Sequence, residues 1–137
     1  MKVLVIGCGR VGSAVALELR AAGWDVTVID EREEALGRLG ESWTGEFVVG
    51  HGMDLQLLRR AGIDDADAVV VTTDGDNSNI VIGQMAQKQF AVPSVVVRIL
   101  DPARAEFYSS RGLNVVCPTS SAIAALTEAV RAEGALN

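Results

Sequence analysis

The residues best suited to chemistry lie in a glycine-rich turn near the start of the chain, Gly7-Cys8-Gly9-Arg10-Val11-Gly12, with the spacing G-x-G-x-x-G. An apolar run precedes the turn and a helical pattern follows it, as a phosphate-binding turn requires. Gly7 lets the chain turn sharply, Gly9 leaves the backbone open to a pyrophosphate, and Gly12 allows close packing. The N–H groups and the partial positive charge at the helix start would hold the phosphates.

Asp30 ends the second apolar run of the chain. Its carboxylate can accept both hydroxyl hydrogens of an adenosine ribose, and it would repel a 2′-phosphate. NAD or an adenine nucleotide is therefore favoured over NADP. Glu31 and Arg32 follow directly; Arg32 is close enough to lie over an adenine, with solvated surface as the alternative. The motif alone is weak evidence, but its flanking strands, helix and acid together indicate a nucleotide site.

Two further side chains have types that could carry catalysis. Cys8 lies in the phosphate turn, but no basic residue or second cysteine is near it in sequence, so a plain reduced thiol is favoured over a nucleophile. Cys117 is expected on a strand too distant for a disulfide with Cys8. His51 is the only histidine, and a general-base role for it lacks an evident substrate pocket.

These residues must be positioned by a repeating α/β pattern. Apolar runs alternate with helical patterns and predict a single α/β domain over residues 1–137, a Rossmann-like doubly wound parallel six-stranded sheet of order 3-2-1-4-5-6. Ligands bind such a sheet at the carboxyl ends of its strands, where the order reverses. Four segments meet there: residues 7–12, Asp30, residues 50–54 and residues 72–77. The predicted strands are residues 2–6, 26–29, 46–49, 66–71, 94–98 and 113–116.

The predicted helices differ in pattern. Asp54 and Asp101 precede two of them, as N-cap residues do. The last helix, residues 119–134, carries more apolar surface than one-sided packing needs; dimerisation and simple packing on the sheet are the alternatives. Residues 31–40 indicate a short helix with three inward residues, Ala35, Leu36 and Leu39. The first helix has apolar residues at helical spacing: Val11, Ala14, Val15 and Leu19.

Composition narrows the function classes. The chain has 137 residues, enough for one domain with its own core, and a net charge of −6 that argues against a nucleic-acid-binding face. Its apolar runs are too short to span a bilayer, so direct membrane insertion is not expected. The first strand is predicted to begin at Lys2, so we expect no secretory signal, and the two cysteines fit a reducing cytoplasm.

Several segments together resemble one family. They are residues 5–12, 28–30 and 58–66, then Thr73-Asp74 with Asn77, Arg98 with Asp101-Pro102, and residues 112–118. In this order they are similar to the N-terminal domains of regulators of potassium conductance (RCK, also TrkA-N or KTN domains). These are the nucleotide-binding lobes of Trk/Ktr-type potassium-uptake regulatory subunits.

The resemblance implies a cytoplasmic regulatory subunit that binds NAD(H) or ATP/ADP and controls a membrane potassium transporter or channel. It implies a homodimer or higher ring, held at the inner face of the cell membrane through the transporter subunit. Arg10 matches an arginine that in some relatives reaches a phosphate, including one bound in a neighbouring subunit; a surface arginine at the helix start is the alternative. By position, the expected binding residues are Gly7, Cys8, Gly9, Arg10, Val11 and Gly12 at the phosphates, Asp30 at the ribose with Glu31 and Arg32 following it, His51, Gly52 and Met53 at the adenine, and Thr72, Thr73, Asp74, Asn77 and Arg98 on the far side.

The sequence departs from the family pattern at His51, where Gly-Asp-Ala is usual and this chain has Gly50-His51-Gly52. His51 either substitutes by stacking or hydrogen bonding, or the affinity for adenine is weakened. Many relatives also carry a further C-terminal domain. Two other functions stay open: a fragment of an NAD-dependent oxidoreductase, and an assembly module with a vestigial site. All six strands build the binding fold and leave nothing for a substrate domain, so we expect a non-enzyme.

Overall fold

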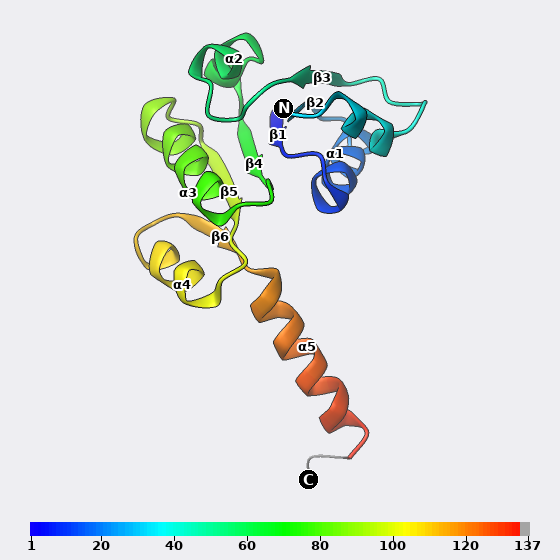
Figure 1. The fold of residues 1–137 in the computed structure, drawn as a ribbon, viewed down its shortest axis with the longest axis vertical. Coiled ribbons are helices and arrows are strands. Elements are labelled where there is room, and N and C mark those ends of the chain that lie inside the picture. The colour runs from blue at the N-terminus through cyan, green and yellow to red at the C-terminus, as the bar shows by residue number, and fades with distance from the viewer. Residues whose placement is uncertain (135–137) are drawn as a thin grey trace.

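The computed structural model describes residues 1–134 and contains one six-stranded sheet, all of whose paired strands are parallel. The strand order is β3-β2-β1-β4-β5-β6, as the sequence predicts (Figure 1). The order reverses between β1 and β4, so this edge of the sheet is the place for a ligand. The strands are β1 (Lys2–Ile6), β2 (Asp25–Asp30), β3 (Glu46–Val49), β4 (Ala68–Val71), β5 (Ser94–Arg98) and β6 (Asn114–Val116).

The strands read as continuous apolar runs because the centre of the sheet is buried on both faces. Successive side chains of β1 point to opposite faces, so Val3 and Val5 join one core cluster while Leu4 and Ile6 join the other. All four are at most 1% exposed. The central strand is therefore enclosed, and its carboxyl end is held in a fixed position.

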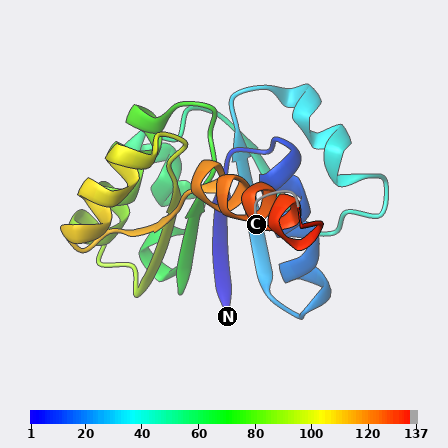
Figure 2. The ribbon, with the colours of Figure 1, turned by 90° about the horizontal axis from the view of Figure 1, so that it is seen from below.

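Helices cover the two faces unequally. Core contacts place α1 (Arg10–Ala21) and the 3₁₀ segment η1 (Glu33–Leu39) on the face of Val3 and Val5. Figures 1 and 2 show η1 and α4 at opposite ends of the sheet. The other face is covered by α2 (Leu55–Arg60), the 3₁₀ turn η2 (Ile63–Asp65), α3 (Asp76–Gln84), its π-helical continuation η3 (Met85–Gln89) and α4 (Pro102–Ser110).

The helix ends follow their local chemistry. The Asp54 carboxylate accepts hydrogen bonds from the N–H groups of Gln56 and Leu57, and Asp101 accepts one from Arg104. Both predicted N-caps are confirmed. Gly62 ends α2 with φ +95°, a left-handed conformation that favours glycine.

Two details of helix packing were predicted wrongly. Of the four apolar residues in the pattern of α1, Leu19 packs against the core and Val15 is half-buried, but Val11 and Ala14 are exposed. The helix buries Gly12, Ser13 and Ala16, because it lies too close to the sheet for larger side chains at these positions. Residues 33–39 form a 3₁₀ segment rather than an α-helix over residues 31–40, and Leu36 is exposed. A short segment with an interior glycine, Gly37, is a weak α-helix former.

The last helix, α5 (Pro118–Ala132), projects away from the sheet (Figure 1). None of its residues is buried, and Ile123, Leu126 and Val130 expose 57%, 69% and 44% of their surface. The alternative prediction, that this helix simply packs on its own sheet, is therefore wrong. The last three of the residues assigned to the domain, 135–137, lie outside the described part of the chain. Across residues 1–134, no helix combines the length and the apolar character that crossing a bilayer requires.

Candidate functional site: a cleft where the strand order reverses

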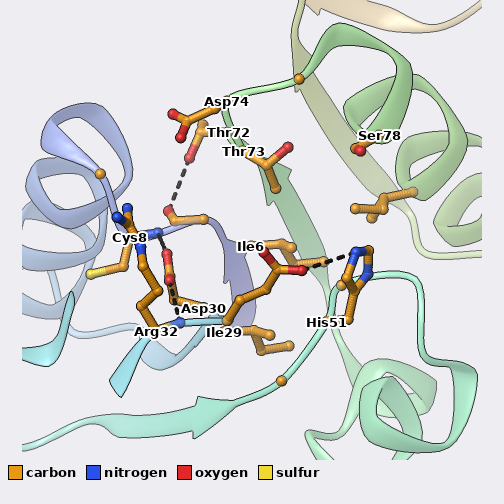
Figure 3. A pocket seen from close by; sticks show the side chains of 17 residues that line it. Ile6, Cys8, Ile29, Asp30, Arg32, His51, Thr72, Thr73, Asp74 and Ser78 are labelled. Carbon is orange, nitrogen blue, oxygen red and sulfur yellow. Dashed lines mark hydrogen bonds and ion pairs between the residues drawn. The ribbon is translucent and has the colours of Figure 1, made fainter. Parts of the chain in front are cut away.

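A cleft of about 290 Å³ lies at the carboxyl ends of β1, β2 and β4. This is close to the lower end of the range typical of small-molecule sites. Figure 3 shows Cys8, Asp30 and Arg32 on one side of the cleft and Thr72, Thr73 and Asp74 on another. The lining residues are Ile6, Gly7, Cys8, Gly9, Ile29, Asp30, Glu31, Arg32, Gly50, His51, Gly52, Thr72, Thr73, Asp74, Gly75, Ser78 and Ile82.

The three glycines of the turn after β1 are needed for different reasons. Gly7 has φ +105°, and a Cβ there would lie 2.7 Å from the Thr72 carbonyl. A Cβ at Gly12 would collide with the Gly7 carbonyl oxygen. At Gly9, by contrast, a Cβ would meet no described atom within 4 Å. Folding thus requires Gly7 and Gly12, whereas the space in front of Gly9 belongs to the cleft.

The start of α1 is available to an anion. Its N-cap is Gly9, and no side chain of residues 1–134 caps the helix, whereas aspartates cap α2 and α4. The first turn of α1 also contains no acidic residue. Backbone N–H groups and the positive end of the helix dipole therefore face the cleft without a competing carboxylate on that turn.

Asp30 joins the phosphate turn to the end of β2. Its Oδ2 accepts a hydrogen bond from the Cys8 N–H at 2.8 Å, and its Oδ1 accepts one from the Arg32 N–H at 2.9 Å. Each carboxylate oxygen has a second lone pair, so the group retains acceptor capacity for ribose hydroxyls. Asp30 is thus both a structural link and a candidate ligand residue.

His51 and Glu31 meet on the β2–β3 side of the cleft (Figure 3). His51 Nδ1 accepts a hydrogen bond from the Met53 N–H, so the proton is on Nε2, which lies 3.0 Å from Glu31 Oε1. Both ring nitrogens are engaged, which does not favour a general base. A Cβ at Gly52 would lie 2.7 Å from Ile6 and 2.9 Å from Ile82, so this loop rests directly on the apolar floor.

The turn after β4 forms the opposite wall. Thr72 Oγ1 donates to the Gly7 carbonyl at 3.1 Å, which fixes the wall to the phosphate turn. Arg98 Nη2 donates to the carbonyl oxygens of Thr72 and Thr73 at 3.1 and 2.9 Å. Asp74 is exposed, and Ser78 from the first turn of α3 also lines the cleft.

The structure brings eleven of the predicted site residues into the cleft lining and leaves six outside it. Arg10 and Val11 are exposed on α1, and Gly12 is buried beneath the turn. The remaining three are Met53, which presents its N–H to His51, Asn77, which accepts a hydrogen bond from Arg104, and Arg98, which supports the wall. The eleven lining residues are Gly7, Cys8, Gly9, Asp30, Glu31, Arg32, His51, Gly52, Thr72, Thr73 and Asp74.

Six lining residues were not predicted as site residues. Ile6 is the last residue of β1, Ile29 is the last apolar residue of β2, and Ile82 comes from α3; the sequence pattern indicates only a core role for these three. The available signal was position, because the residue at the carboxyl end of a central strand borders any ligand there. The other three are Gly50 and Gly75, which fall in segments predicted to meet at the cleft but are not among the expected binding residues, and Ser78 from the first turn of α3.

Cys8 is buried, and its thiol donates to the Ala35 carbonyl at 3.3 Å. Burial is the main factor that raises the pKa of this thiol; the Asp30 carboxylate raises it further, and Arg38 opposes both. A raised pKa keeps the thiol protonated and unreactive at neutral pH. Cys8 and Cys117 are both free, as expected. Residues 1–134 contain no cluster of three side chains that could hold a metal ion.

Comparison with known proteins gives three kinds of match. The TrkA-N domain model matches residues 3–119. A Trk system potassium uptake protein TrkA from Streptomyces coelicolor is 45% identical over 116 residues, which are 85% of this chain and 52% of that protein. The chain thus spans about half the length of this curated relative.

Two solved structures share the fold and have ligands in their names. One is the Shewanella denitrificans Kef CTD in AMP bound form, with 25% identity, a TM-score of 0.81, and coverage of 98% of this chain and 82% of that one. The other is the GsuK channel bound to NAD, with 26% identity, a TM-score of 0.81, and coverage of 98% and 24%.

Proposed function

Because the chain belongs to the TrkA-N domain family, we propose that its cleft binds an adenine nucleotide, NAD(H) or ATP/ADP, and that binding regulates a potassium uptake system. Phosphates would lie at the start of α1 against Gly9, and the adenosine ribose at Asp30. The adenine would lie beside Glu31, Arg32 and His51. The proposal assigns no catalysis to this chain.

One observation carries the binding proposal. Gly12 cannot carry a Cβ because the Gly7 carbonyl is in the way, but nothing described within 4 Å prevents a Cβ at Gly9. Gly9 has φ −86° and ψ −160°, extended backbone that any residue adopts. The fold therefore does not require glycine at this position, whereas a pyrophosphate approaching the helix start does.

The relatives support the ligand class and the partner. The Kef CTD is named as AMP-bound and the GsuK channel as NAD-bound, and their match extends over 98% of this chain. The Streptomyces coelicolor relative is named as part of a Trk potassium uptake system. We accordingly propose that this lobe acts at the cytoplasmic face of the membrane, attached to a potassium transporter subunit.

We also propose that α5 pairs with a second copy of the chain. The helix exposes Ile123, Leu126 and Val130 along one side and contributes nothing to its own domain's core. A nucleotide would then act by favouring one arrangement of the paired lobes. It can shift that equilibrium only by the difference in its affinity for the two arrangements.

The test is a calorimetric titration of the wild type and Gly9→Ala with NAD⁺, NADH, ATP, ADP and AMP. Ala at position 9 should weaken every nucleotide at least about tenfold, equivalent to about 1.4 kcal/mol, because its methyl group occupies the phosphate position. The melting temperature should not fall, since the backbone there already suits alanine.

Gly37→Ala is the matched control, because a Cβ at Gly37 also meets nothing described within 4 Å and Gly37 lies outside the cleft. It should bind as the wild type does. A wild type that binds none of the five nucleotides would overturn the proposal and favour an assembly module. Undiminished binding by Gly9→Ala would show that the phosphates lie elsewhere.

A further inference from the structure

Asn79 is a polar residue that the cleft itself does not contact. It lies on α3, is 1% exposed, and is absent from the lining residues. Its Oδ1 accepts hydrogen bonds from both the N–H and the Oγ1 hydroxyl of Thr73, the former at 3.0 Å. Its Nδ2 donates to the Thr73 carbonyl at 3.1 Å and to the Arg98 carbonyl at 2.9 Å.

These four bonds use the full capacity of the side chain. An asparagine amide has two hydrogens to donate and two lone pairs on its oxygen. Both hydrogens face carbonyl oxygens and both lone pairs face donors, so the amide has one workable orientation. A buried amide that is fully satisfied rigidifies what it contacts, and here every polar group of Thr73 is bound to it.

Arg98 adds a second support to the same turn. Its guanidinium donates to the carbonyl oxygens of Thr72 and Thr73, while its own carbonyl accepts from Asn79. Asp76 fixes the next segment by accepting the N–H groups of Leu100 and Asp101 at 2.8 and 3.0 Å. Hydrogen bonds from α3 and from the end of β5 thus hold the turn after β4 in place.

We propose that Asn79 is a positioning residue that holds the Thr72–Asp74 turn as the wall for the second nucleoside of a dinucleotide. This inference rests on the proposed nucleotide site. The phosphate turn follows β1, which lies between β2 and β4 in the sheet, so Asp30 and His51 line the cleft on the β2–β3 side of that turn and Thr73 and Asp74 on the β4 side. An adenosine bound at Asp30 fills the β2–β3 side of the cleft. Only a ligand that extends past the phosphates can therefore reach the β4 side, where Thr73 and Asp74 lie.

The chemistry of the wall suits a ribose better than another phosphate. Asp74 carries a negative charge and Ser78 a hydroxyl, so the two can accept and exchange hydrogen bonds with ribose hydroxyls, while the carboxylate repels phosphate oxygens. The wall positioned by Asn79 therefore favours a dinucleotide such as NAD over AMP, which ends at the phosphate turn.

The experiment compares NAD⁺ and AMP affinities of the wild type, Asn79→Ala and Gln87→Ala. Gln87 lies on η3, the continuation of α3, and is exposed and outside the cleft lining; its amide donates to the Gly112 carbonyl, so Gln87→Ala controls for removing a hydrogen-bonded amide on this helix. Loss of several hydrogen bonds to the turn should weaken NAD⁺ about tenfold in Asn79→Ala. AMP should bind within about twofold of the wild type, a difference that corresponds to well under 1 kcal/mol.

A merely structural role would weaken both nucleotides together. An equal loss for NAD⁺ and AMP in a folded Asn79→Ala, or no loss for either, would therefore overturn the inference while leaving the nucleotide site intact. Failure of the wild type to bind either ligand would instead defeat the proposed function, and the inference with it.

A second variant covers the case in which Asn79→Ala does not fold. Thr73→Val has nearly the same shape and removes only the hydroxyl that donates to Asn79. It should reduce NAD⁺ affinity in the same selective sense, about threefold, since one hydrogen bond is lost. Unchanged selectivity between NAD⁺ and AMP in Thr73→Val would also contradict the inference.

Discussion

His51 donates its Nε2–H to Glu31 Oε1 across 3.0 Å, which joins the ends of β3 and β2 at the mouth of the cleft. The side chains are 51% and 63% exposed, so the pair adds little to stability. The pair lies beside Asp30, where the adenine of a bound nucleotide would lie, so we expect it to affect nucleotide binding more than stability.

We expect His51→Ala to lower AMP affinity several-fold, because the ring forms part of the adenine wall. The melting temperature should change by no more than about 2 °C, as for loss of an exposed pair. Calorimetry and thermal unfolding on the same samples measure both. AMP affinity equal to that of the wild type would mean that the adenine does not contact this histidine.

Asp30→Ala should weaken NAD⁺ and AMP alike, by roughly 1–3 kcal/mol of binding free energy, through lost hydrogen bonds to a charged group. It should also destabilise the fold, since the N–H groups of Cys8 and Arg32 lose their acceptor. Asp25→Ala, at the opposite end of β2 and exposed, is the control and should bind normally. Titration and chemical denaturation separate the two effects; normal binding by Asp30→Ala would contradict the assigned ribose position.

The thiol of Cys8 should make stability depend on alkaline pH. Burial raises the pKa of Cys8, so the folded state holds this proton to higher pH than the unfolded chain does. Above the ordinary pKa of a thiol the folded state then binds more protons, and the free energy of unfolding should fall as pH rises. Cys8→Ala should flatten this fall. Urea denaturation across pH 7–10 measures the slopes, and identical slopes for wild type and Cys8→Ala would refute the prediction.

Leu126→Glu on α5 should shift the protein towards the monomer, because Leu126 is 69% exposed and lies among the apolar residues proposed to pair. Ser121→Glu places the same charge on the helix side away from Ile123 and Leu126 and serves as the control. Sedimentation equilibrium gives the mass of each. If Leu126→Glu and the wild type have the same mass at all concentrations, α5 is not the pairing surface.

In the core, Leu58→Ala should reduce the free energy of unfolding by about 2–5 kcal/mol, because Leu58 is fully buried in the cluster beneath α2. Leu36→Ala, a change of the same chemistry on exposed η1, is the control and should cost well under that range. Denaturant titration of both variants tests the comparison. Equal losses would show that Leu36 packs as the sequence pattern first indicated.

The predictable parts of this molecule are those encoded within short stretches of sequence. The tight turn after β1 is evident from Gly7 and Gly12, and two helix starts are evident from the N-cap residues Asp54 and Asp101. These features therefore follow directly from residue types. The strand order follows from six alternating units and the rules of parallel sheets.

Features that depend on distant partners could not be predicted in the same way. Asn77 and Asn79 both lie at the start of α3, but only Asn79 is on the buried face of that helix, where it reaches Thr73 and the distant Arg98 carbonyl. The buried face of α1 likewise depends on the close contact between Gly12 and the Gly7 carbonyl. This contact leaves room only for small side chains on that face, where a sequence pattern would favour large apolar ones. The bond between His51 and Glu31 joins two separate loops that no local pattern relates.

The projecting helix α5 has a consequence for the cost of association. A helix of 15 residues without buried side chains is marginal in water, so its order depends on what it contacts. Pairing would bring conformational ordering and contact formation together, and part of the contact energy would be consumed by lost chain entropy. The five alanines among residues 118–132 reduce that loss, since alanine surrenders no side-chain rotamers on entering a helix. Substitutions that change the helix propensity of solvent-facing residues in α5 would thus strengthen or weaken pairing without altering any contact between the two copies.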